Sequence, residues 1–577
     1  MHASAILIVS RPAATIFASL LIVASLLATT AGAQYATATS GVQLGMPVIR
    51  SQAADAAPTR LPDPSTVPST VPGAAGTPAA TVATRQAAQP ATARSSEPMP
   101  GRLASAVQTS TLDGASIYAP QLVPWAGDFS PTPLPDAAFT YDAAEARRPY
   151  DGKSPVPVQR PLIEWGLPLF LNGMIPRSQT FLGETNLVQQ HFYMYGDYRA
   201  GYGGGRNAGG DFHNMAAQFR LDLDWGITST ERFHAFIQPL NRGGDFTGIN
   251  FVDDDFDAQD AFNADFITAF FEGDLGAITG GLTDTWYPFD LPFTAGLIPL
   301  LYQNGIWMDD AVAGAAFALP SKNSKFLRWS NFDATFFAAV DQLNSDAFPG
   351  DKNAAHLFGT AWFIEAYDGY IESGYAYVDD RTNSDRSYHN VTLSFARRYF
   401  WRVANTVRVI GNFGQDLPRD QRTADGALVL IENAWVSRDA LRFVPYLNAF
   451  AGFGRPQSVA RAAAAGGVLR NTGINFETDG INGFPTLDAT ANNTYGGAVG
   501  INLLGPAFDH QLVVEAAYVG VMDNPDDRNA AGEELAFGTR YQIPISHRTL
   551  IRLDGMWAWR DNASDLTGGR IEYRWKF

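Results

Sequence analysis

Short stretches in the second half of the chain alternate between apolar and polar side chains. In residues 569–577 the apolar and aromatic side chains share one parity, at Ile571, Tyr573, Trp575 and Phe577. The charged side chains share the other parity, at Arg570, Glu572, Arg574 and Lys576. Because successive side chains of a β-strand point to opposite faces, this pattern predicts a strand with one apolar face and one charged face.

The same alternation recurs from residue 187 onward, most clearly in 214–225, 402–414, 534–545 and 548–559. Each predicted strand is close to the roughly 9–11 residues that a tilted strand needs to cross a bilayer. We predict about eighteen strands, at 188–198, 214–225, 232–240, 261–272, 275–283, 311–319, 331–342, 357–366, 370–378, 388–399, 402–414, 428–437, 442–453, 494–504, 511–522, 534–545, 548–559 and 569–577.

The predicted connections between these strands alternate in length. Counting back from the C-terminus, polar loops such as 560–568, 523–533 and 454–493 alternate with short turns such as 546–547. The connection 320–330 breaks the pattern, because it is long and basic where a short turn is expected. Long loops at one end and short turns at the other are typical of an outer-membrane β-barrel with an even number of strands. A soluble β-propeller of similar composition has no reason to alternate in this way.

The charged parity indicates what fills the interior of such a barrel. Charged residues on the inner face require a water-filled lumen, which about sixteen to eighteen strands provide and eight do not. We therefore predict an all-β fold, a single large antiparallel transmembrane β-barrel of about 16–18 strands. The side chains predicted to line its pore are Arg220, Asp222, Asp224, Arg402, Arg408, Arg540, Arg552, Asp554, Arg570, Glu572 and Arg574.

The last ten residues carry a family resemblance. A final strand of alternating apolar residues that stops on an aromatic residue, here Phe577, resembles the closing strand of bacterial outer-membrane β-barrel proteins such as porins. The resemblance implies a barrel that contacts outer-membrane lipid and is inserted by the barrel-assembly machinery, which recognises the terminal aromatic residue. Such proteins commonly form homo-oligomers, but no pattern in this chain indicates the interface.

The N-terminal part of the chain differs in composition from the rest. An arginine, an apolar run and the small-residue triplet 31–33 predict a signal peptide over residues 1–33. Residues 34–115 are rich in Ala, Pro, Thr and Ser and predict a disordered spacer, because they offer too little apolar surface to bury. Residues 116–186 form a transition segment rich in Pro and aromatic residues, and 187–577 form the predicted barrel.

One predicted loop has the composition of a pore constriction. Segment 284–310 is long, aromatic and apolar for a surface loop, so we predict that it folds into the lumen, as the third loop of general porins does. The alternative is a surface flap that packs on other loops. Opposed acids and bases in a pore select small polar solutes. The acids that would face the lumen arginines are Asp284, Asp290, Asp309 and Asp310.

Several function classes receive no support. The chain has no Gly-x-Ser-x-Gly, His-Glu-x-x-His or nucleotide-binding glycine loop, so we expect no enzyme activity. It has no cysteine, which excludes disulfides and thiolate metal sites. The acidic run 253–257 lacks the spacing of an EF-hand loop, so we expect neither metal nor cofactor. A formal net charge of −17 argues against nucleic-acid binding.

These observations predict a porin that lets small hydrophilic solutes diffuse passively across the outer membrane. A substrate-specific channel or a polysaccharide-export channel shares the architecture and is the first alternative. A non-transporting surface barrel, an adhesin or a structural protein whose loops carry the function, is the second, and an enzyme with its site at the barrel rim is the third.

Overall fold

The computed structural model describes most of the chain from residue 160 onward. The predicted signal peptide, and most of the predicted spacer and transition segment, lie outside the described residues. Two short strands, β1 (Thr111–Leu112) and β2 (Ala115–Ser116), pair only with each other. The described residues are 111–112, 115–116, 160–167, 169, 179–183, 186–252, 255–437, 442–462, 465–477, 480–505, 510–522 and 532–577.

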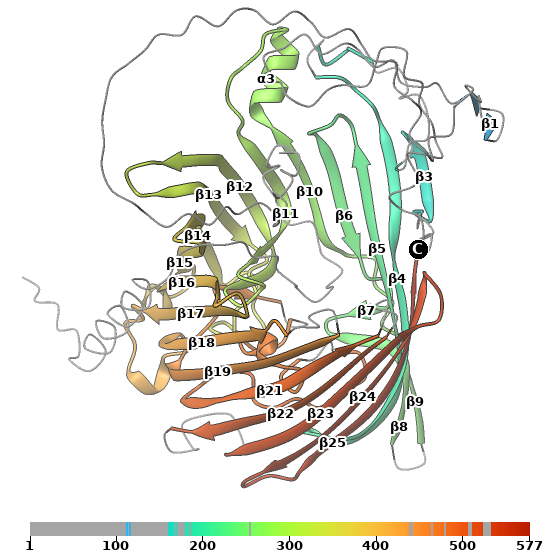
Figure 1. The fold of residues 1–577 in the computed structure, drawn as a ribbon, viewed down its shortest axis with the longest axis vertical. Helices are drawn as coiled ribbons and strands as arrows, with labels where there is room; N and C mark the ends of the chain where they lie inside the picture. The colour runs from blue at the N-terminus through green and yellow to red at the C-terminus, as the bar shows by residue number, and fades with distance from the viewer. Residues whose placement is uncertain are drawn as a thin grey trace, which may run out of the picture. The chain divides into compact units, whose positions relative to one another are not determined.

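Eighteen antiparallel strands form a closed barrel, which confirms the predicted fold class. Figure 1 shows the strands side by side around the wall. β25 returns to β4, from the Thr567–Arg206 pair to the Lys576–Asp197 pair, and this closes the sheet. The strands are β4 (His191–Asn207), β5 (Gly210–Gly226), β6 (Arg232–Ile237), β10 (Phe266–Asp274), β11 (Pro292–Tyr302), β12 (Met308–Ser324), β13 (Trp329–Asp341), β14 (Ala355–Ala366), β15 (Gly369–Asp380), β16 (Tyr388–Tyr399), β17 (Val403–Phe413), β18 (Asp425–Trp435), β19 (Phe443–Arg455), β21 (Thr494–Leu504), β22 (Gln511–Val521), β23 (Glu534–Pro544), β24 (Thr549–Arg560) and β25 (Leu566–Lys576).

Short strands extend the wall at both ends. β3 (Ile163–Gly166) pairs with β4 next to the point where β25 ends, so it continues the line of the last strand. β8 (Asp245–Val252) pairs with β5 and with β9 (Asp255–Gln259), and this hairpin lengthens the wall at the loop end. The other short strands are β7 (Asn241–Arg242) and β20 (Ala460–Arg461).

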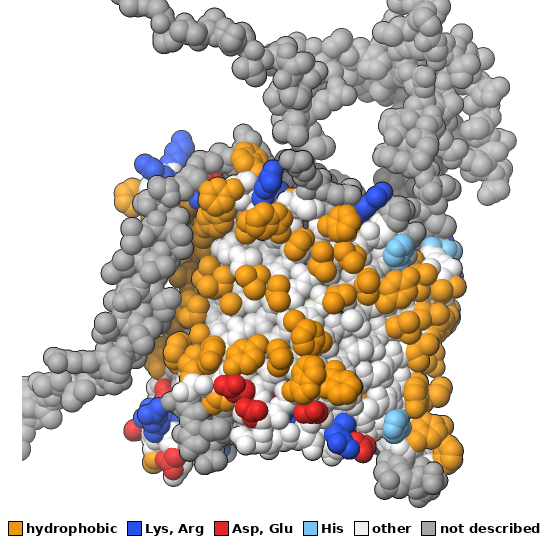
Figure 2. Space-filling view, turned by 60° about the horizontal axis from the view of Figure 1, so that its bottom comes forward, with side chains coloured by type: hydrophobic (Ala, Val, Ile, Leu, Met, Phe, Trp, Pro, Cys, Tyr) orange, Lys and Arg blue, Asp and Glu red, His pale blue; other side chains and the backbone are white. Residues whose placement is uncertain are grey.

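The outer surface of the barrel is apolar. The exposed large side chains on the strands include Trp225, Phe358, Leu393, Phe537, Leu553, Trp557 and Tyr573. Figure 2 shows hydrophobic side chains over the middle of one face, with charged side chains near its two edges. The opposite parity is polar and buried: Arg552 is 7% exposed, whereas its neighbour Leu553 is 42% exposed. The strands therefore present apolar residues outward and charged residues inward. No described helix is long and apolar enough to span a bilayer.

One predicted strand was wrong and another was missed. Residues 275–283 form helix α3 (Leu275–Thr283), because the Asp274 side chain accepts a hydrogen bond from the Ala277 amide, 2.7 Å away, and caps its first turn. The missed strand is β11, which contains two prolines. Pro299 lies beyond Leu297, the last residue of β11 that pairs with β10, so its missing N–H falls where no ladder bond is required on that side. These two errors cancel in the strand count.

The connection after β12 is shorter than predicted. β12 continues to Ser324 and β13 begins at Trp329, so only residues 325–328 form the turn between them. The predicted connection 320–330 was therefore too long at both ends. This turn now matches the short connections 367–368 and 400–402 at the same end of the barrel.

Candidate functional site

The long connection between β19 and β21 lies inside the barrel. We call its described residues, 456–462, 465–477 and 480–493, the plug. The plug contacts strands from all around the ring, including β4, β12, β17, β22 and β23, which is feasible only from within the lumen. In Figure 1 it is the orange segment that follows β19. Its apolar side chains Val459, Leu469, Phe476 and Leu487 are almost fully buried in one hydrophobic cluster with inward-facing wall residues.

The first part of the plug is held by backbone pairing. β20 runs parallel to the start of β12, and the Val459 amide donates to the carbonyl of Trp307 at 2.9 Å. The Gln457 amide donates to Asn412 Oδ1 on β17 at 2.7 Å. Trp307 itself is 1% exposed, and its Nε1 donates to Asn390 Oδ1 on β16 at 2.8 Å. Asn390 Nδ2 also donates to the carbonyl of Gln457 at 2.9 Å, so this end of the plug is fixed to β12, β16 and β17.

A buried glutamate holds the middle of the plug. Glu515 projects from β22 and is 1% exposed. Its carboxylate accepts hydrogen bonds from the amides of Ile474 and Asn475, both at 2.9 Å, and from Asn475 Nδ2 at 2.8 Å. The Tyr446 hydroxyl on β19 donates a further bond at 2.5 Å. Four donors satisfy one buried carboxylate, as burial of a charge requires.

Three arginines surround Asp554 on the neighbouring wall. Asp554 on β24 accepts from Arg540 Nε on β23 and from Arg570 Nε on β25, each at 2.9 Å, and from Arg552 Nε at 2.8 Å. Arg540 also donates from Nη1 to Glu477 of the plug at 2.6 Å. We call these five residues the arginine cluster. Four of them were predicted from sequence as pore-lining, and the structure brings those four together.

Glycines on the inner wall make room for the plug. A methyl group added at Gly538 would come within 2.3 Å of Asn475 Oδ1, and one added at Gly203 within 2.8 Å of Asn482 Cβ. Asn482 in turn donates to the carbonyl of Gly201 at 2.9 Å. A side chain at any of these positions would occupy space that the plug now fills. The wall and the plug are therefore complementary in shape.

Two adjacent glycines of β25 allow a direct test of this fit. A methyl group at Gly568 would lie 2.5 Å from Pro485 Cδ, whereas one at Gly569 would meet no atom within 4 Å. We expect Gly568→Ala to loosen the plug, at a cost of roughly 1–3 kcal/mol for overpacking. Gly569→Ala is expected to leave the plug in place. Limited proteolysis of the plug in the folded barrel measures the difference, and equal cleavage rates in the two variants would contradict it.

The Glu477–Arg540 ion pair gives the plug a defined response to acid. Burial alone would raise the pKa of Glu477, but Arg540 and Arg552, with a smaller contribution from Arg470, hold the pKa below its ordinary value of 4.5. Because this pKa is lowered in the folded state, the ion pair stabilises the plug fully above pH 4.5. That stabilisation is lost as the pH falls through the pKa that Glu477 has in the folded protein. We therefore expect plug proteolysis to be constant near neutral pH and to accelerate below pH 4.5. In Glu477→Gln this acid step should shrink, and an unchanged step would assign it to other carboxyl groups.

Other charged side chains on the inner wall are also paired. Arg199 donates to Glu572 at 2.5 Å, and Arg574 lies 3.6 Å from Asp197. Arg408 on β17 pairs with Glu432 on β18 at 3.0 Å. Asp222 lies 3.5 Å from His234, and Asp224 lies 3.5 Å from Arg232. Arg220 lies on the same face of β5 as Asp222 and Asp224.

Some predicted site residues lie elsewhere. Segment 284–310 is not one inward-folded loop, because β11 and the start of β12 take up about half of it. Only the turn 303–307 between these strands reaches across the lumen, where Gln303 donates to the carbonyl of Glu372 on β15 at 3.4 Å and Trp307 donates to Asn390 on β16 at 2.8 Å. Asp284 caps the C-terminus of α3 and Asp290 is exposed, both in the connection at the turn end of the barrel. Arg402 was predicted on the inner wall, but it is an exposed residue of the turn between β16 and β17. The predicted strand began at Arg402, whereas β17 begins one residue later, at Val403.

Asp309 and Asp310 do lie in the lumen, but on β12 rather than on a loop. Asp309 is 3.6 Å from Arg470 of the plug. Asp310 accepts from the backbone and side-chain amides of Asn344, both at 2.7 Å, and so anchors the loop that follows β13. Their role at a constriction remains a prediction.

Sequence reasoning missed Glu515 and Glu477, which hold the plug, and placed Trp307 in the lumen only as part of segment 284–310. One signal could have found the plug. Residues 456–493 contain Val459, Val468, Leu469, Phe476, Ile481, Phe484 and Leu487, which is too apolar for a solvated surface loop. The same criterion applies to 284–310, where the buried side chains Ile298 and Leu300 belong to β11 and Ile306 and Trp307 belong to the turn that follows it.

No protein-family model matches the chain, and no curated protein matches it in sequence. Several solved structures resemble the barrel. The outer membrane protein opdK from Pseudomonas aeruginosa is 12% identical with a TM-score of 0.43, and the match covers 67% of this chain and 98% of that one. OpdH from the same organism is 11% identical with a TM-score of 0.42, over 67% and 98% of the two chains.

Wzi from Escherichia coli, described as a carbohydrate-binding β-barrel involved in group 1 capsule assembly, is 11% identical with a TM-score of 0.40. That match covers 66% of this chain and 84% of Wzi. With scores this low the likenesses carry no weight for function. The barrel is established by its own strand pairing.

Proposed function

We propose that this protein is an outer-membrane channel for small hydrophilic solutes, in which the plug restricts and selects passage. The observation that carries the proposal is the orientation of the strands: apolar side chains face outward and charged side chains face inward in a closed barrel. Charged inner walls are costly unless water or paired charges fill the lumen. An eighteen-stranded barrel is wide enough for an aqueous path.

The outward face supports a place in a membrane. Exposed aromatic side chains such as Trp225, Trp557 and Trp575 lie toward strand ends, where aromatic girdles meet lipid headgroups. Every strand edge of a closed barrel is paired, which the absence of water in the bilayer core requires. Insertion by the barrel-assembly machinery, expected from the terminal Phe577, belongs to the same proposal.

The packed plug favours a selective channel over an open diffusion pore. An open pore needs a continuous aqueous path, whereas the plug buries Leu469, Phe476 and Trp307 almost completely inside the barrel. Solutes must therefore pass beside the plug or displace it. A substrate-specific channel fits this arrangement better than free passive diffusion.

Single-channel recording in planar bilayers tests the proposal. The full chain is expected to give small, discrete conductance steps that a permeating solute reduces by occupying the path. Liposome swelling with neutral sugars of increasing size measures the width of that path. A barrel that stays silent in both assays, with the plug present and with it removed, would instead be a non-transporting surface protein.

A further inference from the structure

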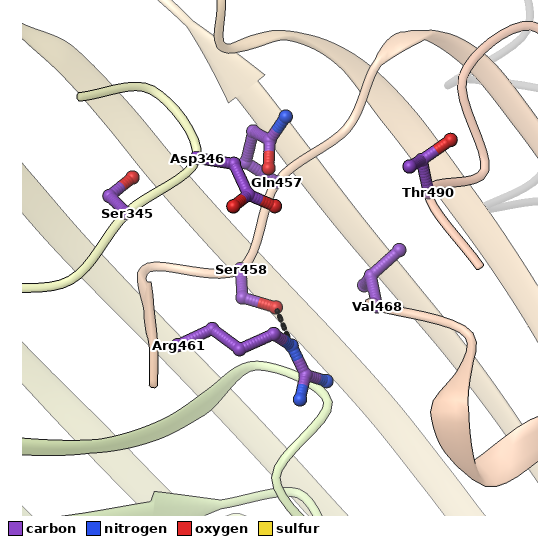
Figure 3. A pocket seen from close by; sticks show the side chains of 7 residues that line it. All are labelled: Ser345, Asp346, Gln457, Ser458, Arg461, Val468 and Thr490. Carbon is purple, nitrogen blue, oxygen red and sulfur yellow. Dashed lines mark hydrogen bonds between the residues drawn. The ribbon is translucent and has the colours of Figure 1, made fainter. Parts of the chain in front are cut away.

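A second site lies where the plug meets the loop that follows β13. A small hollow there, with a cavity volume of about 10 Å³, which is room for roughly one water-sized sphere, is lined by residues of both segments. Figure 3 shows Ser345 and Asp346 of the loop on one side and Arg461, Val468 and Thr490 of the plug on the others. The hollow is separate from the arginine cluster and involves none of the five residues of that cluster.

The guanidinium of Arg461 is the main feature of this hollow. Arg461 is 8% exposed, and its Nη2 atom is buried without an acceptor among the described residues. Its Nε donates to Ser458 Oγ at 3.3 Å and its Nη1 to the carbonyl of Ala465 at 3.4 Å. The nearby carboxylate of Asp309 pairs with Arg470 instead. Burying a cation with one N–H donor unsatisfied costs free energy, unless a ligand accepts a hydrogen bond from that donor.

Burial lowers the pKa of the Arg461 guanidinium to about 10, although Asp309 and Asp346 oppose the decrease. The side chain is therefore still protonated at neutral pH, and its charge is only partly balanced. Asp346 at the hollow is exposed to solvent, which screens its effect on the buried cation.

The hydroxyl of Ser345 is a further donor at the hollow. Gln457 donates from Nε2 to the carbonyl of Thr423 at 3.2 Å, and Figure 3 shows its amide oxygen, not its nitrogen, on the side of Ser458. The Ser345 hydroxyl shares one bond with the Tyr388 hydroxyl at 3.2 Å, and either oxygen can donate. The hydroxyl of Thr490 is already bonded to Asp488 at 2.7 Å, and that of Ser458 to the carbonyl of Ile306 at 2.7 Å. Ser345 thus adds a donor beside the buried cation, and Asp346 is the only acidic side chain among the lining residues.

We infer that this hollow binds a small monovalent anion, such as chloride, between Arg461 of the plug and Ser345 of the loop. The single cation and the small volume suit a singly charged ion, and Asp346 disfavours multiply charged ones. The bound ion joins the plug to the loop after β13. This inference goes beyond the proposed function, because the site requires only the folded barrel and not conduction.

Chloride-35 NMR line broadening on the purified full chain in non-ionic detergent tests the site. Arg461→Gln is expected to remove the protein-dependent broadening, while Arg419→Gln, at an exposed arginine of another loop, should retain it. Asp346→Asn is expected to tighten chloride binding several-fold, a gain that misfolding cannot mimic. Equal broadening in the wild type and Arg461→Gln would overturn the inference, as would an Asp346→Asn variant that binds chloride no more tightly than the wild type.

Discussion

Removing most of the plug is expected to raise the single-channel conductance by roughly an order of magnitude, because the width of the narrowest point sets the flow of ions. The variant replaces residues 465–488 with a short Gly/Ser linker and keeps Val459 and β20 on the wall. It removes Leu469, Phe476 and Leu487, which are among the most buried side chains of the plug. The steps should become large and ohmic, and swelling should admit larger sugars.

The matched control changes a loop that does not enter the lumen. Residues 382–385 form an exposed connection between β15 and β16, and a Gly/Ser replacement there should leave the conductance unchanged. Circular dichroism and heat-modifiable gel mobility check that both barrels are folded. A folded barrel without the plug that conducts no better than the wild type would show that the barrier lies elsewhere.

Asp554→Asn is expected to destabilise the barrel by about 3–5 kcal/mol, the usual cost of removing one partner from a buried ion pair. Three guanidinium groups share this carboxylate, and its side chain is 3% exposed. Asparagine keeps the shape and one acceptor oxygen but removes the charge that balances the arginines. Guanidinium unfolding of the barrel in lipid or detergent measures the change.

The matched control is Asp211→Asn. Asp211 pairs with Arg206 at 2.6 Å near the loop end, where both side chains are solvent-exposed. An exposed pair contributes little, so this variant should unfold at the denaturant concentration of the wild type. If Asp554→Asn behaves in the same way, water in the lumen rather than Asp554 balances the arginines. A loosened plug in Asp554→Asn would follow from the link of Arg540 to Glu477.

Parts of the candidate site were predictable because strand parity is a local property. Once residues 548–559 are a strand, Arg552 and Asp554 must share the face opposite Leu553 and Trp557. Arg540 and Arg570 follow from the same rule on the flanking strands. Their convergence on one carboxylate was not predictable, because it depends on the register between strands, which the structure shows as the Arg540–Asp554 and Asp554–Arg570 pairs.

The helix at 275–283 and the plug illustrate the limits of local pattern. Both segments are apolar with several glycines, and composition alone does not separate a helix, a strand and a buried loop. For residues 275–283, the N-terminal cap formed by Asp274 favours the helix. For the plug, the decisive partner is Glu515, on a strand about forty residues further along the chain. A local stretch of sequence does not contain both the plug residues and Glu515, so local pattern could not reveal their contact.

The sequence by itself determined the class of fold, the side of each strand that faces outward and the charged character of the inner wall, because all three follow from a period of two residues. Only the tertiary structure decided which connection fills the lumen, which charges pair and where a buried arginine keeps a free donor. Those outcomes depend on contacts between residues far apart in the chain, and such contacts stabilise the protein only once the barrel has closed.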